Sequence, residues 1–337
     1  MTTSGDGAVK VVPVRHVGRW VGAAFVLLGI AMLIHTLLSK IPTGQRRCSS
    51  VNGVSVCHGV LKWRFGWDVI AKYFTNQQIL HGLVITLELT VLAMAIGIIL
   101  GVVIAIMRLS QNRLLSGTAW TYTWFFRGTP VYVQILFWGY ITFLYPSFSI
   151  GIPFTNWDLV HFHAISLFTT FRAGLTALSL NEAAYMSEIA RSGLISVDEG
   201  QVEAAKSLGM SRGKTLRLIV LPQAMRVIIP PTGNEVISML KTTSLVVAIS
   251  LTELLGAVTN IYSSTFQIIP MLLVASLWYL GISTILSIGQ FYIERHFAKG
   301  SLRSPPLTPI QRLRRDLQGI WSKMRTRRSA VATGASP

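Results

Sequence analysis

The sequence predicts an all-α, polytopic integral membrane protein with about six transmembrane helices and both termini in the cytoplasm. Of its residues, 51% are hydrophobic and only 13% are charged, against about 25% charged in soluble domains. Long apolar runs alternate with short basic segments. The net charge of +17 comes mainly from the two ends and two internal loops, which indicates membrane topology rather than nucleic-acid binding.

A membrane-spanning helix needs about 20 mostly apolar residues. Four stretches clearly qualify, and two more are long enough but more polar. The four are 21–38, 83–107, 119–145 and 270–293, and the two are 164–194 and 227–250. The first run is longer than the apolar part of a signal peptide, and no small-residue cleavage site follows it. We therefore expect a signal anchor there.

Charges in the connections predict the orientation. Basic residues lie before the first span, between spans two and three (Arg108, Arg113), throughout the loop between spans four and five, and in the tail. The loops 146–163 and 251–269 contain no Lys or Arg. Basic connections face the cytoplasm, so these two loops are exterior. The connection 39–80 is basic although this topology puts it outside. We base the orientation on the other four connections, whose charges agree with one another.

The same exterior connection predicts a β-hairpin. Asn52-Gly53 is the strongest two-residue hairpin signal. Counting outward from this turn pairs Cys48 with Cys57 at a non-hydrogen-bonded position, where side chains come closest. Outside the membrane a disulfide between them would persist; two free thiols are the alternative.

No catalytic set or metal site emerges from the sequence. The seven His are scattered, and His161 and His163 have no Cys or carboxylate cluster at metal spacing beside them. The segment 209–215 approaches a phosphate-binding loop, but three residues rather than four separate its glycines and no buried strand precedes it. We expect neither an enzyme nor an ATP site, so any ATP hydrolysis would belong to a partner.

The loop between spans four and five, at about 198–226, predicts a knob of two short helices. The first covers 201–208 and ends at Gly209; the second starts after Ser211, which can cap it, and runs through Leu221 until Pro222 stops it. Small Ala204 and Ala205 would form a flat face on this knob, with Leu208 and Met210 at its tip. Such a knob either enters a groove on another protein or lies on lipid headgroups.

The run Glu203-Ala204-Ala205, followed by Gly209 and by Ile219-Val220-Leu221-Pro222, resembles the EAA loop of ATP-binding-cassette importer permeases. The segments 127–134, 184–193, 221–224 and 241–245 resemble the polar-amino-acid branch of that family. The resemblance covers about 82–294. It divides the chain into 1–80 (signal anchor and extracytoplasmic loop), 81–295 (permease domain) and 296–337 (basic cytoplasmic tail).

This resemblance implies partners and a location. The coupling residues Glu203, Ala204, Ala205, Leu208, Gly209, Met210, Leu221 and Pro222 would dock into a separate ATPase subunit, which binds the ATP, so that this chain needs no cofactor. A second permease, identical or different, would complete the path through a bacterial cytoplasmic membrane. An extracytoplasmic amino-acid-binding protein would deliver the cargo.

Several ionisable residues fall within the spans, where each costs about 2.5–3.5 kcal/mol. Asn181, Tyr185 and Glu188 recur every three or four residues and share one helix face. With Asn234 and Lys241 they would offer a zwitterion both charge signs, and we predict that these five line the substrate path. Interhelical ion pairs that fix packing are the alternative. The run from Arg127 to Pro130 predicts a kink.

Other readings remain open. A permease for peptides, metals or sulfur compounds would share the EAA loop, whereas a secondary transporter would need an inverted repeat, and the sequence contains no internal self-similarity. For the tail, Thr308 and Pro309 can start an amphipathic helix lying on anionic lipid. A solvated, disordered tail is the alternative, and nucleic acid is not an expected partner.

Overall fold

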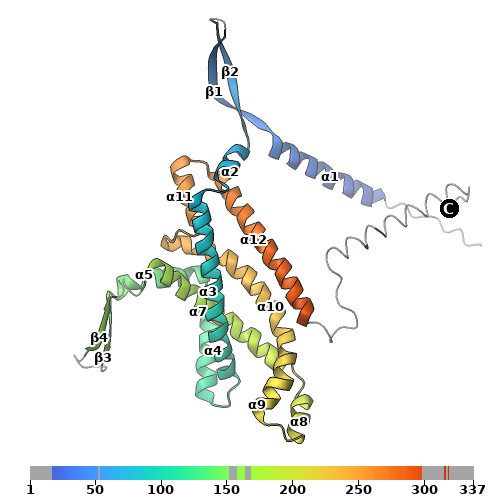
Figure 1. The fold of residues 1–337 in the computed structure, drawn as a ribbon, viewed down its shortest axis with the longest axis vertical. Coiled ribbons are helices and arrows are strands. Elements are labelled where there is room, and N and C mark those ends of the chain that lie inside the picture. Colours follow the sequence, from blue (N-terminus) through green and yellow to red (C-terminus); the bar gives the residue numbers. More distant parts are fainter. Residues whose placement is uncertain are drawn as a thin grey trace, which may run out of the picture. The chain divides into compact units, whose positions relative to one another are not determined.

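The computed structural model describes residues 17–51, 54–151, 158–163, 168–297, 315 and 318, which are mainly helical (Figure 1). The chain divides into two compact units. Unit 1 comprises Met1–Gln77 and Val258–Val274, and unit 2 comprises Gln78–Ala257 and Ala275–Pro337.

Unit 1 contains the predicted hairpin. Helix α1 (Val17–Leu38) is followed by antiparallel strands β1 (Lys40–Val51) and β2 (Val54–Trp63) and by the short helix α2 (Trp67–Tyr73). The strand register places Cys48 opposite Cys57, which confirms the predicted pairing of positions. The turn residues and the side chains of 41–62, which include both Cys, lie outside the described residues, so the disulfide stays a prediction.

The remaining elements begin with the long helix α3, and Pro130 separates the two helices α4 and α5 that follow it. They are α3 (Gln77–Arg108), α4 (Arg113–Gly128), α5 (Val131–Leu144), β3 (Ser147–Gly151), β4 (Asp158–His163), α7 (Thr170–Ile195), α8 (Glu199–Ser207), α9 (Arg212–Thr215), the π-helical turn η1 (Leu216–Val220), α10 (Leu221–Thr242), the 3-10 helix η2 (Thr243–Ile249), α11 (Leu254–Thr265) and α12 (Ile268–Phe297).

Three helices of the described residues are long and apolar enough to cross a membrane: Val21–Leu38, Gln77–Arg108 and Ile268–Phe297. A fourth results if Arg212–Ile249 and Leu254–Thr265, which meet at a bend of 48°, form one broken span. The six predicted spans differ from this count at 119–145 and 164–194. Pro130 splits the first into two short helices, and α7 buries polar side chains such as Ser187.

The fold is mainly helical, as predicted, but 146–163, expected as an exterior loop, contains two strands. Here β3 and β4 pair antiparallel, with Ser149 opposite His161. The segment 251–269 was also expected to be a loop, yet it contains α11. In the tail only Arg315 and Gln318 are described, both helical; the cap residues Thr308 and Pro309 lie outside the described residues, so the lipid-bound helix stays a prediction.

Helix α7 packs against α4, α5 and α10 in unit 2. Two glycines of α3 allow a close approach between α3 and α7: a Cβ on Gly97 would lie 2.6 Å from Glu182 Cγ, and one on Gly101 would lie 2.6 Å from Met186 Cβ. Small residues commonly let membrane helices approach this closely. The geometry therefore fixes the position of Glu182 along the α3–α7 contact.

The turn between η2 and α11 is held by one buried carboxylate. Glu253 is fully buried and accepts hydrogen bonds from Tyr279 Oη (2.9 Å), Thr86 Oγ1 (3.2 Å) and the Gly256 amide (2.9 Å). The adjacent η2 packs through Ile249 against Gly139 of α5, where a Cβ would lie within 2.2 Å of Ile249 Cγ2. These contacts tie the turn to α3 and α12 and seat η2 on α5.

Candidate functional site

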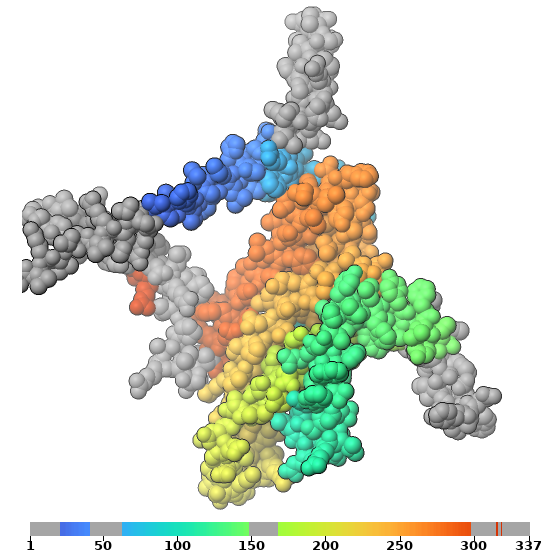
Figure 2. Space-filling view, turned by 180° about the vertical axis from the view of Figure 1, so that it is seen from behind, coloured from blue at the N-terminus to red at the C-terminus, as the bar shows by residue number. Residues whose placement is uncertain are grey.

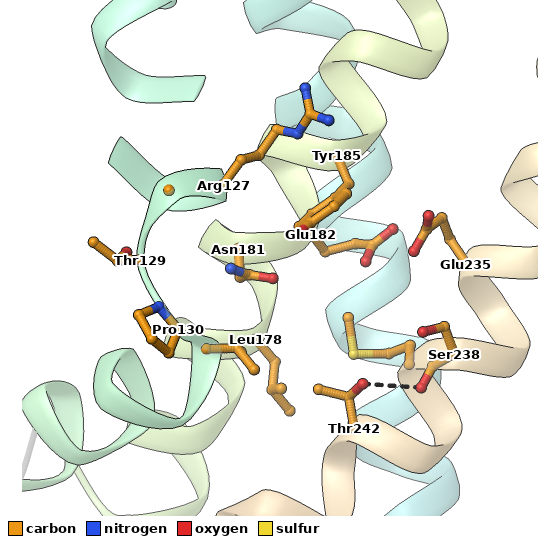
Figure 3. Close-up of a pocket in the computed structure, with 13 residues that line it drawn as sticks. Arg127, Thr129, Pro130, Leu178, Asn181, Glu182, Tyr185, Glu235, Ser238 and Thr242 are labelled. Carbon is orange, nitrogen blue, oxygen red and sulfur yellow. Dashed lines mark hydrogen bonds between the residues drawn. The ribbon is translucent and has the colours of Figure 1, made fainter. Parts of the chain in front are cut away.

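A pocket of about 460 Å³ lies among α4, α5, α7 and α10 of unit 2 (Figure 3). It combines charged, hydroxyl and apolar groups, and its position inside predicted spans makes these polar groups functional candidates. The lining residues are Arg127, Gly128, Thr129, Pro130, Val131, Leu178, Asn181, Glu182, Tyr185, Glu235, Ser238, Met239 and Thr242.

One wall of the pocket is the break between α4 and α5. Pro130 has no N–H, so the carbonyl of Phe126, four residues earlier, loses its helical partner. That oxygen instead accepts hydrogen bonds from Gln134 Nε2 (2.9 Å) and Asn181 Nδ2 (3.0 Å). Gln134 Nε2 also contacts Thr129 O (3.1 Å) and Thr129 Oγ1 (2.8 Å). The sequence predicted the kink, and two amide side chains stabilise it.

The charged groups of the pocket come from three helices. The Arg127 guanidinium lies 5.3 Å from the ring centre of Tyr185, a cation–π distance. The carboxylates of Glu182 and Glu235 face one another from α7 and α10 (Figure 3). Glu182 Oε1 is buried and has no hydrogen-bond partner among the described residues. A buried carboxylate oxygen without a donor is costly, so this atom can bind a donor group that enters the pocket.

The five residues predicted for the substrate path separate into two groups. Asn181 and Tyr185 line the pocket. Glu188, Asn234 and Lys241 are not among its lining residues: Asn234 Oδ1 accepts from Gln290 Nε2 of α12 (3.0 Å), and Lys241 is exposed. The pocket therefore provides no evidence that Glu188, Asn234 and Lys241 take part in transport.

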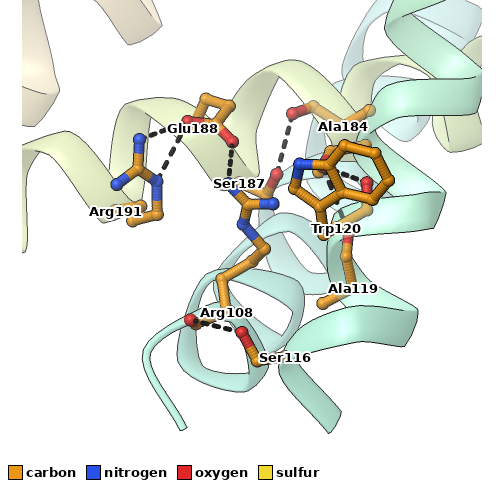
Figure 4. A network of polar contacts seen from close by, with 9 residues as sticks. Arg108, Ser116, Ala119, Trp120, Ala184, Ser187, Glu188 and Arg191 are labelled. Carbon is orange, nitrogen blue, oxygen red and sulfur yellow. Dashed lines mark hydrogen bonds and ion pairs between the residues drawn. The ribbon is translucent and has the colours of Figure 1, made fainter. Parts of the chain in front are cut away.

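Glu188 lies in an ion-pair network between α3 and α7 (Figure 4). Its Oε1 is 3.2 Å from Arg108 Nη2, and its Oε2 is 2.8 Å from Arg191 Nη2 and 3.0 Å from Arg191 Nε. Ser116 Oγ donates to the carbonyl of Arg108 (3.2 Å), which connects the start of α4 to the same cluster. This is the arrangement expected of the alternative reading, in which the charges fix packing.

Helical periodicity had not assigned Arg127, Glu182 and Glu235 to the path, although all three are ionisable residues within predicted spans. Glu182 follows Asn181 directly and so lies off the face shared by Asn181 and Tyr185. Because neighbouring helix residues point about 100° apart, periodicity alone could not place it in the pocket. Contact with α3 and α10 decides that it is there.

The loop at about 198–226, called the coupling loop below, contains the first predicted short helix as α8, and its second helix begins after Ser211 as α9. Asp198 Oδ1 caps α8 by accepting from the Gly200 amide (2.7 Å). After α8 the chain turns at Gly209, whose φ of +75° lies in the left-handed region that favours glycine. The amides of Gly209 and Met210 donate to the carbonyls of Lys206 (2.9 Å) and Ala205 (3.1 Å), closing the helix end as a Schellman motif.

The predicted coupling side chains differ in exposure. Leu208 is 82% exposed and Ala205 only 3%. Met210 is partly buried, and the other five predicted residues, Glu203, Ala204, Gly209, Leu221 and Pro222, are exposed. The yellow-green and yellow α8–α9 segment forms the lower end of unit 2 in Figure 2. Most of the predicted docking surface is therefore accessible to a partner.

Pro222 does not stop the second helix, contrary to the prediction. α9 continues through η1 into α10, and Pro222 occupies the first turn of α10. A π-helical turn precedes this proline and supplies the change of hydrogen-bond register. The coupling loop is thus joined to the pocket wall at Glu235 by helical backbone.

A helical bundle with broken helices, a polar pocket and a projecting helical loop is typical of a membrane transport subunit. The family of binding-protein-dependent transport system inner membrane components matches residues 97–299. The arginine transport system permease protein ArgU of Corynebacterium glutamicum is 45% identical over 304 residues, covering 90% of this chain and 87% of ArgU.

Two further relatives agree. The histidine/lysine/arginine/ornithine transport system permease protein HisM of Salmonella typhimurium is 36% identical over 228 residues, covering 65% of this chain and 92% of HisM. A crystal structure of an amino acid ABC transporter with histidines has a TM-score of 0.55 and 34% identity, covering 68% of this chain and 97% of that one. The chain therefore belongs to the family of binding-protein-dependent transport system inner membrane components. It is a permease subunit of ATP-binding-cassette importers rather than an enzyme.

Proposed function

We propose that the chain is one of two permease subunits of a bacterial importer for cationic amino acids, with its substrate path through the pocket of Figure 3. The observation that carries this proposal is the buried Glu182 oxygen, which receives no hydrogen bond from the part of the chain that the structure describes, in a pocket it shares with Glu235.

The charges of the pocket suit such a cargo. Arg127 can bind the α-carboxylate of an amino acid, and one of the two carboxylates can bind its α-ammonium. The other carboxylate then remains for a cationic side chain. A neutral amino acid would leave that charge uncompensated, which is unfavourable at low dielectric. The names of ArgU and HisM include arginine, lysine, histidine and ornithine, which supports cationic amino acids as the cargo class.

We further propose six spans with both termini in the cytoplasm. The split pair α4–α5 counts as the third span and α7 as the fourth, because protein contacts can satisfy broken or polar segments at membrane depth. This topology puts the coupling loop with Leu208 and Gly209 in the cytoplasm, where an ATPase subunit would bind ATP and dock. A second permease and an extracytoplasmic binding protein complete the importer.

The test is uptake by the reconstituted complex with its ATPase and binding protein. Arginine import should require ATP, and Glu182→Gln and Glu235→Gln should each lower arginine uptake by about tenfold, the effect of losing about 1.4 kcal/mol of binding. Glu88→Gln is the matched control, since Glu88 is exposed on α3 and is not a pocket residue. Normal arginine uptake in both pocket variants would refute the proposed site, and uptake by the chain alone under an ion gradient would refute the importer.

A further inference from the structure

A second pocket, of about 370 Å³, lies within unit 1. Its walls come from two segments far apart in the sequence, both predicted to be exterior: the end of β2 with the start of α2, and the turn between α11 and α12. The lining residues are Trp63, Arg64, Gly66, Asp68, Val69, Phe266, Gln267, Ile268, Ile269 and Pro270. We call it the outer pocket.

The outer pocket has a well-defined base. Gly66 has a φ of +62°, and a Cβ there would lie 2.6 Å from Pro270 Cγ, so glycine is required for the two segments to meet. The Arg64 amide donates to Ser39 O (3.0 Å), and Trp67 Nε1 donates to Leu37 O (2.8 Å). These bonds tie the pocket wall to the end of α1.

The rim of the outer pocket has an unusual aromatic residue. Phe266 follows α11 with a φ of +57°, although non-glycine residues rarely adopt this conformation. Its side chain is nevertheless 84% exposed. Burial within unit 1 therefore does not account for the ring, and a projecting aromatic beside a concave surface is typical of a protein interface.

The rim is also basic. Arg64 lines the pocket, Lys40 lies beside the lining residue Trp63, and Lys72 lies one helical turn along α2 from the lining residue Asp68. All three are exposed, and none of them pairs with a carboxylate within the described part of the chain. Lys40 Nζ instead lies 4.4 Å from the ring centre of Trp63. Across 39–80 the sequence has six Lys and Arg residues against one acidic residue, Asp68. This is the connection whose charge opposed the predicted topology, so a specific use for exterior positive charge would explain it.

We propose that the outer pocket and its basic rim form a docking surface for the extracytoplasmic binding protein, which would present acidic side chains around an apolar slot for Phe266. The inference rests on the proposed topology, which puts this surface outside. Charge complementarity of this kind accelerates encounter and fixes orientation without requiring tight binding, which suits a carrier that must dock and leave. Anionic headgroups could attract the same cations, but they require neither a built concavity nor a projecting ring.

The experiment uses the full permease with its ATPase in nanodiscs, and the purified extracytoplasmic binding protein of the same importer as the probe. Arg64→Glu, Lys72→Glu and Phe266→Asn should each weaken binding by about tenfold, the first two with a smaller salt dependence. Asn is chosen because it tolerates left-handed backbone. At saturating binding protein, the maximal uptake rate should be unchanged. Arg113→Glu, an exposed cation at the start of α4, is the matched control and should have no effect.

The outcomes separate the two proposals. Suppose that the binding protein stimulates the wild-type complex. Unchanged binding in all three rim variants would then overturn the docking surface alone. Loss of affinity for anionic lipid in the nanodisc with unchanged protein binding would likewise overturn it and assign the cations to headgroups. A wild-type complex that the binding protein does not stimulate would refute the proposed function itself.

Discussion

Gly209→Asp is the most informative perturbation of the coupling loop, because the chain itself tolerates a side chain there. A Cβ on Gly209 meets nothing within 4 Å. The substitution therefore costs mainly the left-handed backbone, about 1–2 kcal/mol for an L-residue. Asp is among the residues that adopt this conformation more readily. We expect Gly209→Asp to reach the membrane at the wild-type level.

Docking to an ATPase subunit would raise the energetic cost of Gly209→Asp. If Gly209 enters a groove of an ATPase subunit, the new carboxylate is buried without a partner. Burying this carboxylate would cost about 3 kcal/mol, a modest value for an unpaired charge. The affinity of the permease for the ATPase subunit would then fall by more than about a hundredfold. Co-purification with the ATPase and ATP-driven uptake in proteoliposomes should therefore both be lost.

Two controls separate charge from shape. Gly209→Asn has nearly the same size without the charge and should retain more ATPase than Gly209→Asp. Gly213→Asp introduces the same charge in α9, where a Cβ also meets nothing within 4 Å, and should weaken the complex by less than about tenfold. Normal ATPase binding and uptake in Gly209→Asp would refute the coupling role; equal losses for Asp and Asn would contradict the role assigned to charge.

Two further substitutions and one chemical test concern the fold. Glu253→Ala leaves the Tyr279 hydroxyl and the Gly256 amide without the Glu253 acceptor, at a cost of about 1–3 kcal/mol each. The thermal unfolding temperature of the complex should therefore fall further than in Glu253→Gln. Equal shifts in the two variants would count against the hydrogen-bond network of Glu253. Gly97→Val puts a Cβ 2.6 Å from Glu182 Cγ and should lower arginine uptake and cost about 1–3 kcal/mol of stability, whereas Gly29→Val, with nothing within 4 Å, should do neither. Cys48 and Cys57 should both resist alkylation until reductant is added; mass spectrometry finding both alkylated without it would exclude the disulfide.

The sequence alone determined the local features whose causes are local. Asn52-Gly53 fixes a hairpin register because a two-residue turn leaves one way to count outward, and the register of Cys48 and Cys57 follows. Gly209 ends α8 because the left-handed conformation there favours glycine. The EAA-like loop also predicted the family to which the chain belongs.

The tertiary structure decided which polar side chains meet. Glu182, Glu188 and Glu235 are all carboxylates within predicted spans, and helical periodicity selected only Glu188 for the substrate path. Only the packing of α7 against α3 and α10 puts Glu182 and Glu235 in one pocket and leaves Glu188 with Arg108 and Arg191. Helical periodicity gives the angle between residues of one helix, but not the neighbour that each face meets. Contacts between distant segments supply that neighbour, as they do where Gly66 lets α2 approach Pro270.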